Sequence, residues 1–279
     1  MAQKIWFITG ASRGFGKEWA IAALERGDKV AAAVRSLDSV GDLVAQYGDA
    51  VLPIQLDVTD RSAVFDAVDK AHATFGQIDV VINNAGYGLL GAVEDFTESQ
   101  IRDQFETNVF GTIWVLQAVL PVLRDQGRGH VLNVSSIGGV ITLPYGGVYA
   151  ASKWAIEGLT ETLAQDVHDL GIRVTIIEPG AYGTGFQQSA AVAEPHPAYR
   201  QVKQQLTSFL SGSDSYDPAN TRAAILTVVD AEAPPLRLIL GPAYTTIASV
   251  YNHRLDEWAR WEAVSLQAAG IDAGMAGPE

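Results

Sequence analysis

A tyrosine and a lysine four positions apart, Tyr149 and Lys153, are the residues of this chain whose types and spacing most directly suggest chemistry. On a helix, residues four apart share one face, so the ammonium can lie beside the phenol and favour the phenolate. Such a pair could transfer a proton. A serine pair, Ser135 and Ser136, lies a short way upstream. The pair alone is weak evidence, because Tyr-x-x-x-Lys occurs by chance on many exposed helices.

A glycine-rich run near the N-terminus is the second chemical feature. It reads Thr9-Gly10-Ala11-Ser12-Arg13-Gly14-Phe15-Gly16 and follows a short apolar run. Glycines permit positive φ and let backbone amides approach an anion, while the following helix directs its positive end at the same place. The spacing Gly-x-x-x-Gly-x-Gly differs from the Gly-x-Gly-x-x-Gly fingerprint, so a plain glycine-rich turn stays an alternative. We expect cofactor pyrophosphate to contact Gly10, Ser12, Arg13, Gly14, Phe15 and Gly16.

The end of the second apolar run bears on the choice of cofactor. In dinucleotide-binding folds an acidic residue about 20 positions beyond the glycines accepts hydrogen bonds from the adenosine ribose. Here that run ends Ala33-Val34-Arg35-Ser36, without an acid. Arg35, helped by Arg13, could instead bind a 2'-phosphate through a planar set of donors. The sequence therefore favours NADP over NAD, although either arginine could be a solvated surface charge.

The elements that must position these residues alternate between short apolar runs and longer segments of helical periodicity. Seven such runs with crossover-length spacers predict a parallel sheet covered by helices on both faces. We therefore expect one α/β, doubly wound Rossmann-type domain over residues 1–279, with a first helix at 17–26. The predicted strands are 4–9, 29–34, 51–56, 80–83, 130–134, 173–177 and 236–240.

Two segments fall outside this alternation. Residues 181–235 form an unusually long connection broken by prolines and glycines, and long connections in compact domains are usually lids or binding loops. We expect the substrate lid there. Residues 245–270 have helical apolar spacing, which predicts an amphipathic helix that docks on the core or, alternatively, forms a subunit contact or pocket wall.

Composition narrows the class of protein. With 32 acidic against 19 basic residues the net charge is -13, which disfavours nucleic acid and anionic lipid as partners. The absence of cysteine excludes disulfides, thiolate metal ligands and cysteine nucleophiles. The apolar run 113–123 is shorter than the ~20 residues needed to span a bilayer, and we expect no signal peptide and a cytoplasmic location. His168 and His196 lack ligand-spaced partners, so no metal is expected.

Together these residues resemble the short-chain dehydrogenase/reductase family, and the match runs from Lys4 to about Phe186. Members similar to hydroxysteroid dehydrogenases and carbonyl reductases look closest. The family motifs occur here in order as Thr9-Gly10-x-x-x-Gly14-x-Gly16, Asp57-Val58, Asn83-Asn84-Ala85-Gly86, Asn108, Ser136, Tyr149-x-x-x-Lys153 and Pro179-Gly180.

The resemblance implies four catalytic roles. Tyr149 would be the acid in carbonyl reduction and the base in alcohol oxidation, with Lys153 lowering its pKa from near ~10 and binding the nicotinamide ribose. In the family the active serine precedes the tyrosine by thirteen residues, which selects Ser136 to hold the substrate oxygen; a loop hydroxyl is the alternative. Asn108 would bind a water that links Lys153 to solvent, although an isolated asparagine there is usually a packing or capping residue.

The resemblance also implies cofactor contacts. Asp57 and Val58 would flank adenine, although Asp57 could simply cap a helix. The segment Asn84-Ala85-Gly86 would lie along the adenosine ribose, or else form a simple turn. Beyond Pro179-Gly180, Thr184 would contact the nicotinamide carboxamide.

The substrate is less defined by sequence. Pocket candidates by position suggest an apolar or aromatic carbonyl compound, and core packing is the alternative role for each of them. We expect an NADP(H)-dependent oxidoreductase that interconverts a ketone or aldehyde with an alcohol, and a homodimer or homotetramer. A nucleotide-sensing module without turnover, or an isomerase or dehydratase of the same fold, are the alternatives. The pocket candidates besides Ser136 and Tyr149 are Leu143, Pro144, Tyr145, Tyr182 and Phe186.

Overall fold

The computed structural model describes residues 2–186, 190–194, 196–204 and 215–271. The chain separates into two compact units, Met1–Gly241 and Pro242–Glu279. Each unit is described by itself below. The predicted lid, 181–235, extends in part outside the described residues.

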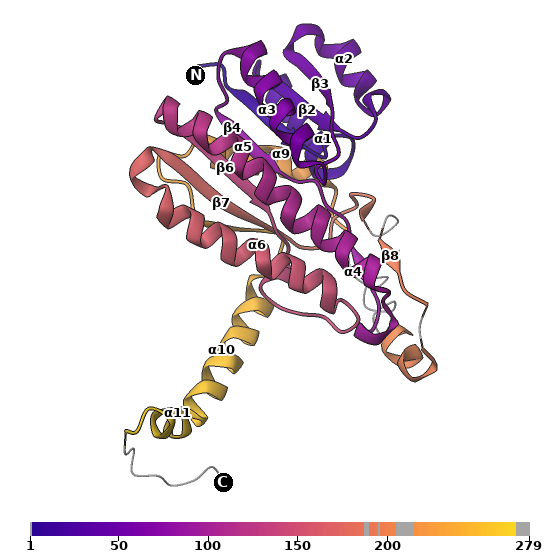
Figure 1. The fold of residues 1–279 in the computed structure, drawn as a ribbon, viewed down its shortest axis with the longest axis vertical. Coiled ribbons are helices and arrows are strands. Elements are labelled where there is room, and N and C mark those ends of the chain that lie inside the picture. The colour runs from indigo at the N-terminus through magenta and orange to yellow at the C-terminus, as the bar shows by residue number, and fades with distance from the viewer. Residues whose placement is uncertain (1, 187–189, 195, 205–214, 272–279) are drawn as a thin grey trace. The chain divides into compact units, whose positions relative to one another are not determined.

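The first unit is built on a parallel sheet of seven strands in the order β3-β2-β1-β4-β6-β7-β9 (Figure 1). The predicted α/β fold is therefore confirmed, and each of the seven predicted strands is present within two residues of its expected bounds at either end. The continuous apolar runs form these strands because both faces of the sheet are covered. Their bounds are β1 Ile5–Thr9, β2 Lys29–Val34, β3 Val51–Gln55, β4 Val80–Asn83, β6 Gly129–Val134, β7 Ile172–Pro179 and β9 Arg237–Leu240.

The order of the strands predicts a ligand-binding crevice at one edge of the sheet. β1 pairs with β2 on one side and with β4 on the other, so the direction of winding reverses at β1. In open parallel sheets, ligands bind outside the carboxyl ends of the strands at such a reversal. The glycine-rich run follows β1 directly and therefore opens onto this crevice.

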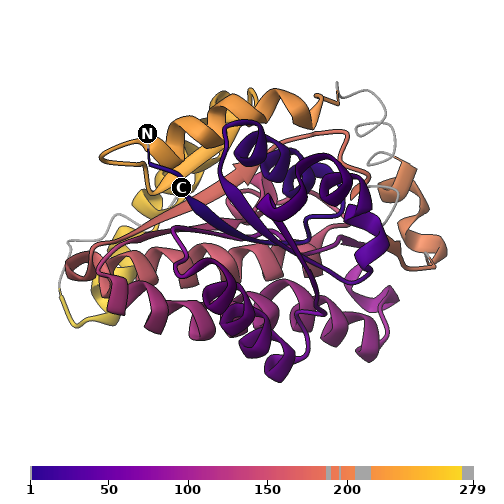
Figure 2. The ribbon, with the colours of Figure 1, turned by 90° about the horizontal axis from the view of Figure 1, so that it is seen from above.

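Helices cover both faces of the sheet, as Figure 2 shows from above. On one face Trp6 and Ile8 of β1 pack with Trp19 in a buried cluster that includes α1, α2 and α9. On the other face Phe7 packs with Val64 in a second cluster that includes α3, α5 and α6. The helices are α1 Gly14–Glu25, α2 Gly41–Tyr47, α3 Arg61–Phe75, α4 Glu98–Phe105, α5 Gly111–Gln126, α6 Gly147–Asp166 and α9 Arg222–Asp230.

The sequence missed three features of this unit. α9 lies inside the predicted lid but belongs to the core: Ile225 is buried against α1, and Trp19 Nε1 donates to Thr221 Oγ1 at 2.8 Å. The lid prediction is therefore too long at its C-terminal end. A small parallel pair, β5 Leu89–Leu90 and β8 Ala191–Val192, was not predicted. α1 also begins three residues earlier than expected, within the glycine run.

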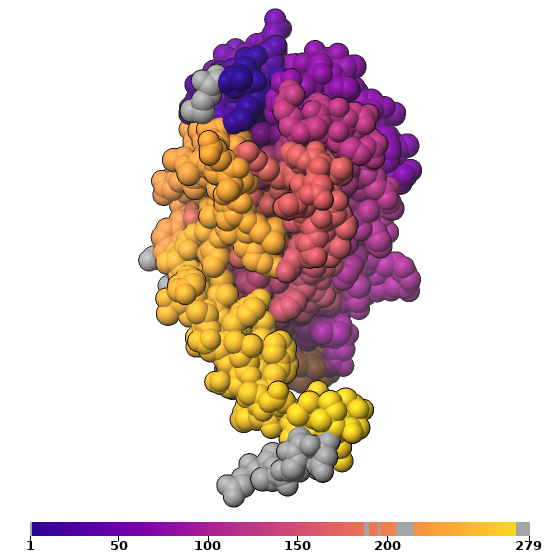
Figure 3. Space-filling view, turned by 90° about the vertical axis from the view of Figure 1, so that its left-hand side faces the viewer, coloured from indigo at the N-terminus to yellow at the C-terminus, as the bar shows by residue number. Residues whose placement is uncertain are grey.

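Ion pairs form at the amino ends of the strands, the edge of the sheet opposite the predicted crevice. Asp230 of α9 pairs with Lys4, and with Arg26 at 2.7 Å. Figure 3 shows the N-terminal residues beside the orange segment that contains α9. These ion pairs tie the last crossover helix to the start of the chain.

A continuous helical stretch, Glu98–Gln126, is long and apolar enough by length and composition to cross a membrane. Core helices pass the same test, and half of this stretch is buried. Val115 and Val119 lie in the core cluster beside α3, which accounts for its apolar character.

The second unit contains two helices, α10 Tyr244–Arg260 and α11 Glu262–Ala268. The segment predicted as helical, 245–270, is thus helical with a break at Trp261. None of the described residues of α10 or α11 is buried, and Leu255 and Trp258 are exposed. Docking of this segment stays a prediction.

Candidate active site

The predicted site residues converge on the carboxyl ends of four neighbouring strands. The glycine run follows β1, Asn84-Ala85-Gly86 follows β4, Ser136 follows β6, and Pro179-Gly180 lies at the end of β7. Parallel strands end at the same edge of a sheet, so residues far apart in the chain meet there. α6, which carries Tyr149 and Lys153, also begins at this edge.

The glycine run has the geometry of an anion-binding turn. Gly10 and Gly14 have φ of 66° and 54°, and a Cβ atom at Gly16 would lie 2.4 Å from the Gly10 carbonyl oxygen. Arg13, the N-cap of α1, makes no side-chain capping bond, and the first turn holds no acid. The free amide groups and the helix dipole therefore suit a pyrophosphate group.

Asn84 and Thr9 hold this turn against the end of β4. The Asn84 side-chain amide donates to the carbonyl oxygens of Thr9 and Gly10, at 3.1 and 3.0 Å. Thr9 Oγ1 accepts from the backbone amides of Asn84 and Ala85, at 3.0 and 3.1 Å. The Asn84 amide group is therefore engaged within the protein. Sequence reasoning named Thr9 as the first residue of the glycine run but assigned it no role in the site.

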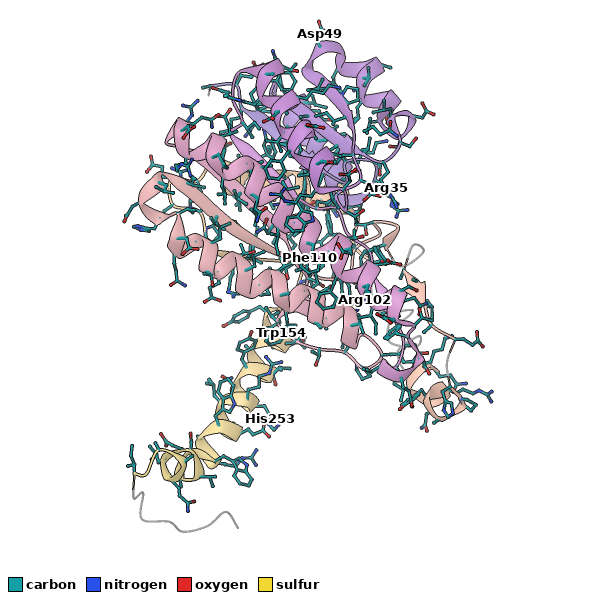
Figure 4. The ribbon with its side chains drawn as sticks, viewed as in Figure 1. Arg35, Asp49, Arg102, Phe110, Trp154 and His253 are labelled. Carbon is teal, nitrogen blue, oxygen red and sulfur yellow. The ribbon has the colours of Figure 1, made fainter. Side chains whose placement is uncertain are left out.

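Arg13 and Arg35 are exposed, the first in the glycine run before α1 and the second directly after β2. Arg35 directly follows β2 and projects outward in Figure 4. Within the described part of the chain, no carboxylate forms an ion pair with either guanidinium group. Both are therefore available to an anionic ligand.

Asp57 and Val58 follow β3, and the hydrogen bonds of Asp57 show whether it caps the next helix. Asp57 Oδ1 accepts from the Thr59 amide at 3.0 Å and from its hydroxyl at 2.8 Å, forming a local turn. The N-cap of α3 is Asp60, which accepts from the Ala63 amide at 3.0 Å. The alternative that Asp57 caps the helix is therefore wrong.

Ser136 and Tyr149 face the same small space. A Cβ atom at Gly138 would lie 3.4 Å from both Ser136 Oγ and Tyr149 Cε1. Ser136 Oγ accepts from the Gly138 amide at 3.0 Å, which fixes the hydroxyl oxygen. Lys153 is buried on the same helix face, with Nζ 6.0 Å from the centre of the Tyr149 ring. Three of the four predicted catalytic residues, Ser136, Tyr149 and Lys153, thus lie close together.

The electrostatics of the tyrosine differ from the sequence prediction. Burial raises the pKa of Tyr149 to about 12, and a hydrogen bond with Ser136 opposes this shift. The expected lowering by Lys153 is wrong for this structure, because the ammonium donates instead to the Val134 carbonyl oxygen at 2.9 Å. Burial also lowers the pKa of Lys153 to about 8, against the charge of Glu157. Tyr149 is therefore fully protonated at neutral pH, as a proton donor must be.

Asn108 lies in a π-helical turn, Glu106–Phe110, between α4 and α5. Such turns are frequent at functional sites because they re-aim side chains. Asn108 Nδ2 donates to the Tyr87 carbonyl oxygen at 3.0 Å and to Ser152 Oγ at 3.2 Å. A Cβ atom at Gly86 would lie 3.0 Å from Asn108 Oδ1 and 3.7 Å from Lys153 Nζ. Asn108 therefore borders Lys153, and its relay role stays a prediction.

Ser152 is a further site residue that the sequence did not reveal. Its hydroxyl donates to the Tyr149 carbonyl oxygen at 2.7 Å while accepting from Asn108. Ser152 thereby joins the π-helical turn to α6. A serine immediately before Lys153, at a position that the helix buries, was the signal for this role.

The segment after β7 closes the site opposite the glycine turn. A Cβ atom at Gly14 would lie 2.8 Å from the Thr184 Cβ atom, so Thr184 packs directly against the glycine turn, and its contact with the nicotinamide stays a prediction. The ring of Phe186 lies 5.4 Å from the ring of Tyr149. Phe186 therefore packs beside the ring of Tyr149, and its role as a pocket wall stays a prediction.

The other pocket candidates have different surroundings. Tyr182 packs against Phe15 and Tyr216, with ring centres 5.1 and 5.7 Å apart. Tyr145 is buried, with an unusual φ of 70°, whereas Leu143 is exposed. These contacts place Tyr182 in a packing role beside the glycine turn.

The two histidines considered as metal ligands have local partners. His168 lies beside Asp169, and His196 caps the short helix Pro197–Tyr199. In the described residues, no cluster of three metal-ligating side chains is found.

Comparison with known proteins decides the family. The short chain dehydrogenase family model matches residues 4–195. The chain belongs to the short-chain dehydrogenase family. A solved short-chain dehydrogenase from Streptomyces avermitilis is 40% identical, with a TM-score of 0.90 over 96% of this chain and 99% of that chain.

Two curated relatives of this short-chain dehydrogenase extend the comparison. Oxidoreductase BOA17 of Botryotinia fuckeliana is 41% identical over 95% of this chain and 99% of its own length. The 3-ketodihydrosphingosine reductase of Bacteroides thetaiotaomicron is 38% identical, over 87% of this chain and 89% of its own. Structures of this fold have been solved in complex with NADP+ and with NADH. This short-chain dehydrogenase is thus an oxidoreductase of a fold that binds nicotinamide nucleotides.

Proposed function

We propose that this short-chain dehydrogenase interconverts a ketone or aldehyde with an alcohol, using NADP(H), with Tyr149 as the proton donor in reduction. The observation that carries the proposal is the meeting of Ser136 Oγ and the Tyr149 ring at one point, with Lys153 behind the ring. A carbonyl oxygen placed there would be within reach of two hydroxyl groups. The glycine turn beside it would hold the cofactor, because no side chain caps the N-terminus of α1 and the backbone of the turn leaves no room for side chains.

The residues of the chain divide the reaction between them. When bound, the reduced nicotinamide supplies the hydride that adds to the carbonyl carbon. Ser136 donates a hydrogen bond that orients the carbonyl oxygen, and Tyr149 transfers its proton to that oxygen as negative charge develops. Lys153 stabilises the resulting tyrosinate by its positive charge. Alcohol oxidation reverses these steps.

The preference for NADP rests on Arg13 and Arg35. Both guanidinium groups are exposed beside the crevice, without a carboxylate partner in the described residues. An additional phosphate on the adenosine ribose would supply that partner, and guanidinium–phosphate pairs are strong because they are charge-assisted and bidentate.

The substrate class follows from Phe186. An aromatic ring beside the reactive hydroxyl favours an apolar or aromatic carbonyl compound over a small polar one. The name of the 3-ketodihydrosphingosine reductase, a relative with a ketone substrate, agrees with this class.

We also propose that two or four copies assemble through α4, the π-helical turn and α6. Phe110 and Trp154, on these neighbouring helices, are 39% and 40% exposed (Figure 4). A groove of about 520 Å³ beside Phe110 is lined also by Ile101 and Phe105. Exposed apolar patches of this kind mark protein interfaces.

A turnover assay tests the function. The protein is mixed with NADPH or NADH and a panel of ketones and aldehydes, and loss of reduced-nicotinamide absorbance is followed. Tyr149→Phe should abolish turnover, whereas Tyr47→Phe, at the partly buried C-terminal end of α2, should retain it. Equal turnover in both variants would refute the role of Tyr149. Binding of NADPH without any turnover would favour a sensing module, and product formed without net NADPH consumption would favour an isomerase or dehydratase.

A further inference from the structure

Glu157 continues the line of reactive side chains along α6. It follows Lys153 by four residues, as Lys153 follows Tyr149, so the three side chains lie on one face of the helix. Glu157 is only 5% exposed. A buried carboxylate at this place needs an explanation, because desolvation strongly disfavours an unpaired charge.

Arg237, at the start of β9, binds this carboxylate from the neighbouring sheet. Its Nη1 donates to Glu157 Oε2 and, at 3.0 Å, to Glu178 Oε1 on β7. Its Nη2 donates to Glu161 Oε2 at 2.7 Å. The cluster therefore joins α6 to two adjacent strands through one guanidinium group.

The cluster carries more negative than positive charge. Glu157 and Glu178 are both buried and share one nitrogen of Arg237, whereas Glu161 is 52% exposed. Glu157 Oε1 and Ser135 Oγ are both buried, and the Ser135 hydroxyl is placed to donate to this carboxylate, which favours its charged form. A Cβ atom at Gly139 would lie 2.9 Å from Glu157 Oε1 and 2.4 Å from Ser135 Oγ. This carboxylate oxygen is thus directed towards the end of β6 and away from Arg237.

In the part of the chain that the structure describes, no carboxylate forms a direct ion pair with the ammonium of Lys153 at this same strand end. Its ammonium is buried and donates to the Val134 carbonyl oxygen, the residue before Ser135. A carbonyl group satisfies one donor but does not balance a buried charge. The carboxylate of Glu157, one helical turn away, can balance this charge, since opposite charges attract strongly in a medium of low polarity.

We propose that Glu157, held by Arg237, is a positioning residue for proton transfer: its carboxylate is the counter-charge that keeps Lys153 protonated beside Tyr149. This inference rests on the proposed function for the experiment that measures turnover, but not for the experiment that measures the pKa of Lys153. In this proposal Arg237 holds Glu157 in place, whereas Glu161 is a partner of Arg237 that faces the solvent.

The titration of the groups fits this role. Burial raises the pKa of Glu157 to about 7 and lowers that of Lys153 to about 8, which the Glu157 charge opposes. Glu157 is therefore ionised in the pH range in which Lys153 would otherwise lose its proton. In the described part of the chain, the other charged groups around Glu157 are Glu178 on β7, Arg237 on β9 and Glu161 on α6.

The experiment compares Glu157→Gln with Glu161→Gln. Both substitutions keep the shape of the side chain and remove one charge that pairs with Arg237, but only the first removes the carboxylate one helical turn from Lys153. In Glu157→Gln, the basic limb of the kcat profile should move to lower pH by about one unit, which reduces kcat about fivefold at pH 8. Glu161→Gln should keep the profile of the original protein, and Glu157→Asp, which retains the charge, should largely restore it. Superimposed profiles for the two glutamine variants would overturn the proposal.

A second measurement does not depend on turnover. The pKa of Lys153 is followed by NMR of lysine-labelled protein, with the resonance assigned by its loss in Lys153→Arg. The pKa should fall in Glu157→Gln and stay unchanged in Glu161→Gln. If turnover is absent but this difference is present, the proposed function fails and the role of Glu157 stands. If Glu157→Gln does not fold, the unsubstituted protein decides: the Lys153 resonance should show an inflection near pH 7 as Glu157 titrates, and its absence would refute the coupling.

Discussion

A methyl group on Gly14 would lie 2.8 Å from the Cβ atom of Thr184, so the turn after β1 and the segment after β7 are in close contact. Gly14 also has a φ of 54°, a conformation that costs a residue with a Cβ atom roughly 1–2 kcal/mol. Close approach and backbone conformation therefore both require glycine where the cofactor would bind.

Gly14→Ala should accordingly weaken NADPH binding at least about tenfold and lower the free energy of unfolding by roughly 2 kcal/mol. Fluorescence titration with NADPH and urea denaturation measure these two effects. The matched control is Gly158→Ala, since Gly158 is an exposed helix residue with no atom near its missing side chain. That variant should be stabilised by about 0.5–1 kcal/mol and bind NADPH normally. Normal binding in Gly14→Ala would contradict the placement of the cofactor at this turn.

Arg35→Ala should weaken NADPH about tenfold or more while leaving NADH nearly unchanged, because a charge-assisted hydrogen bond contributes about 1.5–3 kcal/mol. Dissociation constants for both cofactors give the ratio directly. Arg102→Ala is a suitable control, since Arg102 pairs with Glu98 on the exposed face of α4 (Figure 4). Equal losses for the two cofactors would remove Arg35 from the 2'-phosphate site.

Phe186→Ala should reduce kcat/KM for an aromatic ketone about tenfold or more and for acetone much less. Its ring lies against Tyr149, so truncation removes apolar contact area beside the reacting carbonyl group. The NADPH dissociation constant should stay constant, which separates loss of substrate contacts from damage to the site. A uniform loss over all ketones would point to misplacement of Tyr149 instead.

Phe110→Glu combined with Trp154→Glu should convert the assembly to a monomer, because each substitution places a charge on a proposed contact surface. Analytical ultracentrifugation measures the mass of the species. Val44→Glu provides the comparison, since Val44 is an exposed apolar residue on α2. An unchanged mass in the double variant would place the interface elsewhere.

His130 should make stability depend on pH. Burial lowers its pKa to about 3 in the folded protein, from 6.5 in the unfolded chain. As the pH falls, the unfolded chain therefore takes up a proton on His130 before the folded protein does. The contribution of His130 to the free energy of unfolding is highest above pH 6.5 and decreases below it. Between pH 7 and pH 5 the loss amounts to about 2 kcal/mol. In His130→Gln, urea denaturation should show a decrease in the free energy of unfolding between pH 7 and pH 5 that is smaller by about 2 kcal/mol. Parallel pH dependence in the two proteins would disprove this role of His130.

Much of the fold followed from local properties of the chain. Buried parallel strands are continuous apolar runs, so β1 and β6 could be located from composition and from the turns that follow them. Tyr149 and Lys153 could be paired because a spacing of four residues slightly exceeds one helical turn and returns to the same face. The glycine spacing predicted an anion-binding turn, since its geometry is set by the backbone of a few adjacent residues.

Other features depend on the register of elements that are distant in sequence. α9 was taken for part of a lid, because prolines and glycines surround it and only packing against α1 shows that it belongs to the core. The π-helical turn that aims Asn108 requires Tyr87 and Ser152, which lie on other elements. The pKa of Tyr149 was expected to fall, but burial raises it. Desolvation is a property of the whole surrounding structure and cannot be obtained from a spacing of residues.

The sequence by itself thus determined the class of fold, the order of its strands along the chain and the helix face that carries Tyr149 and Lys153, because each depends on short-range periodicity. The tertiary structure decided what surrounds that face. Glu157 meets Arg237 only because α6 packs on β7 and β7 pairs with β9, so that Arg237 reaches Glu178 and Glu157, which are 59 and 80 positions away in the chain. Charges act through space, and the folded backbone sets the distances between them.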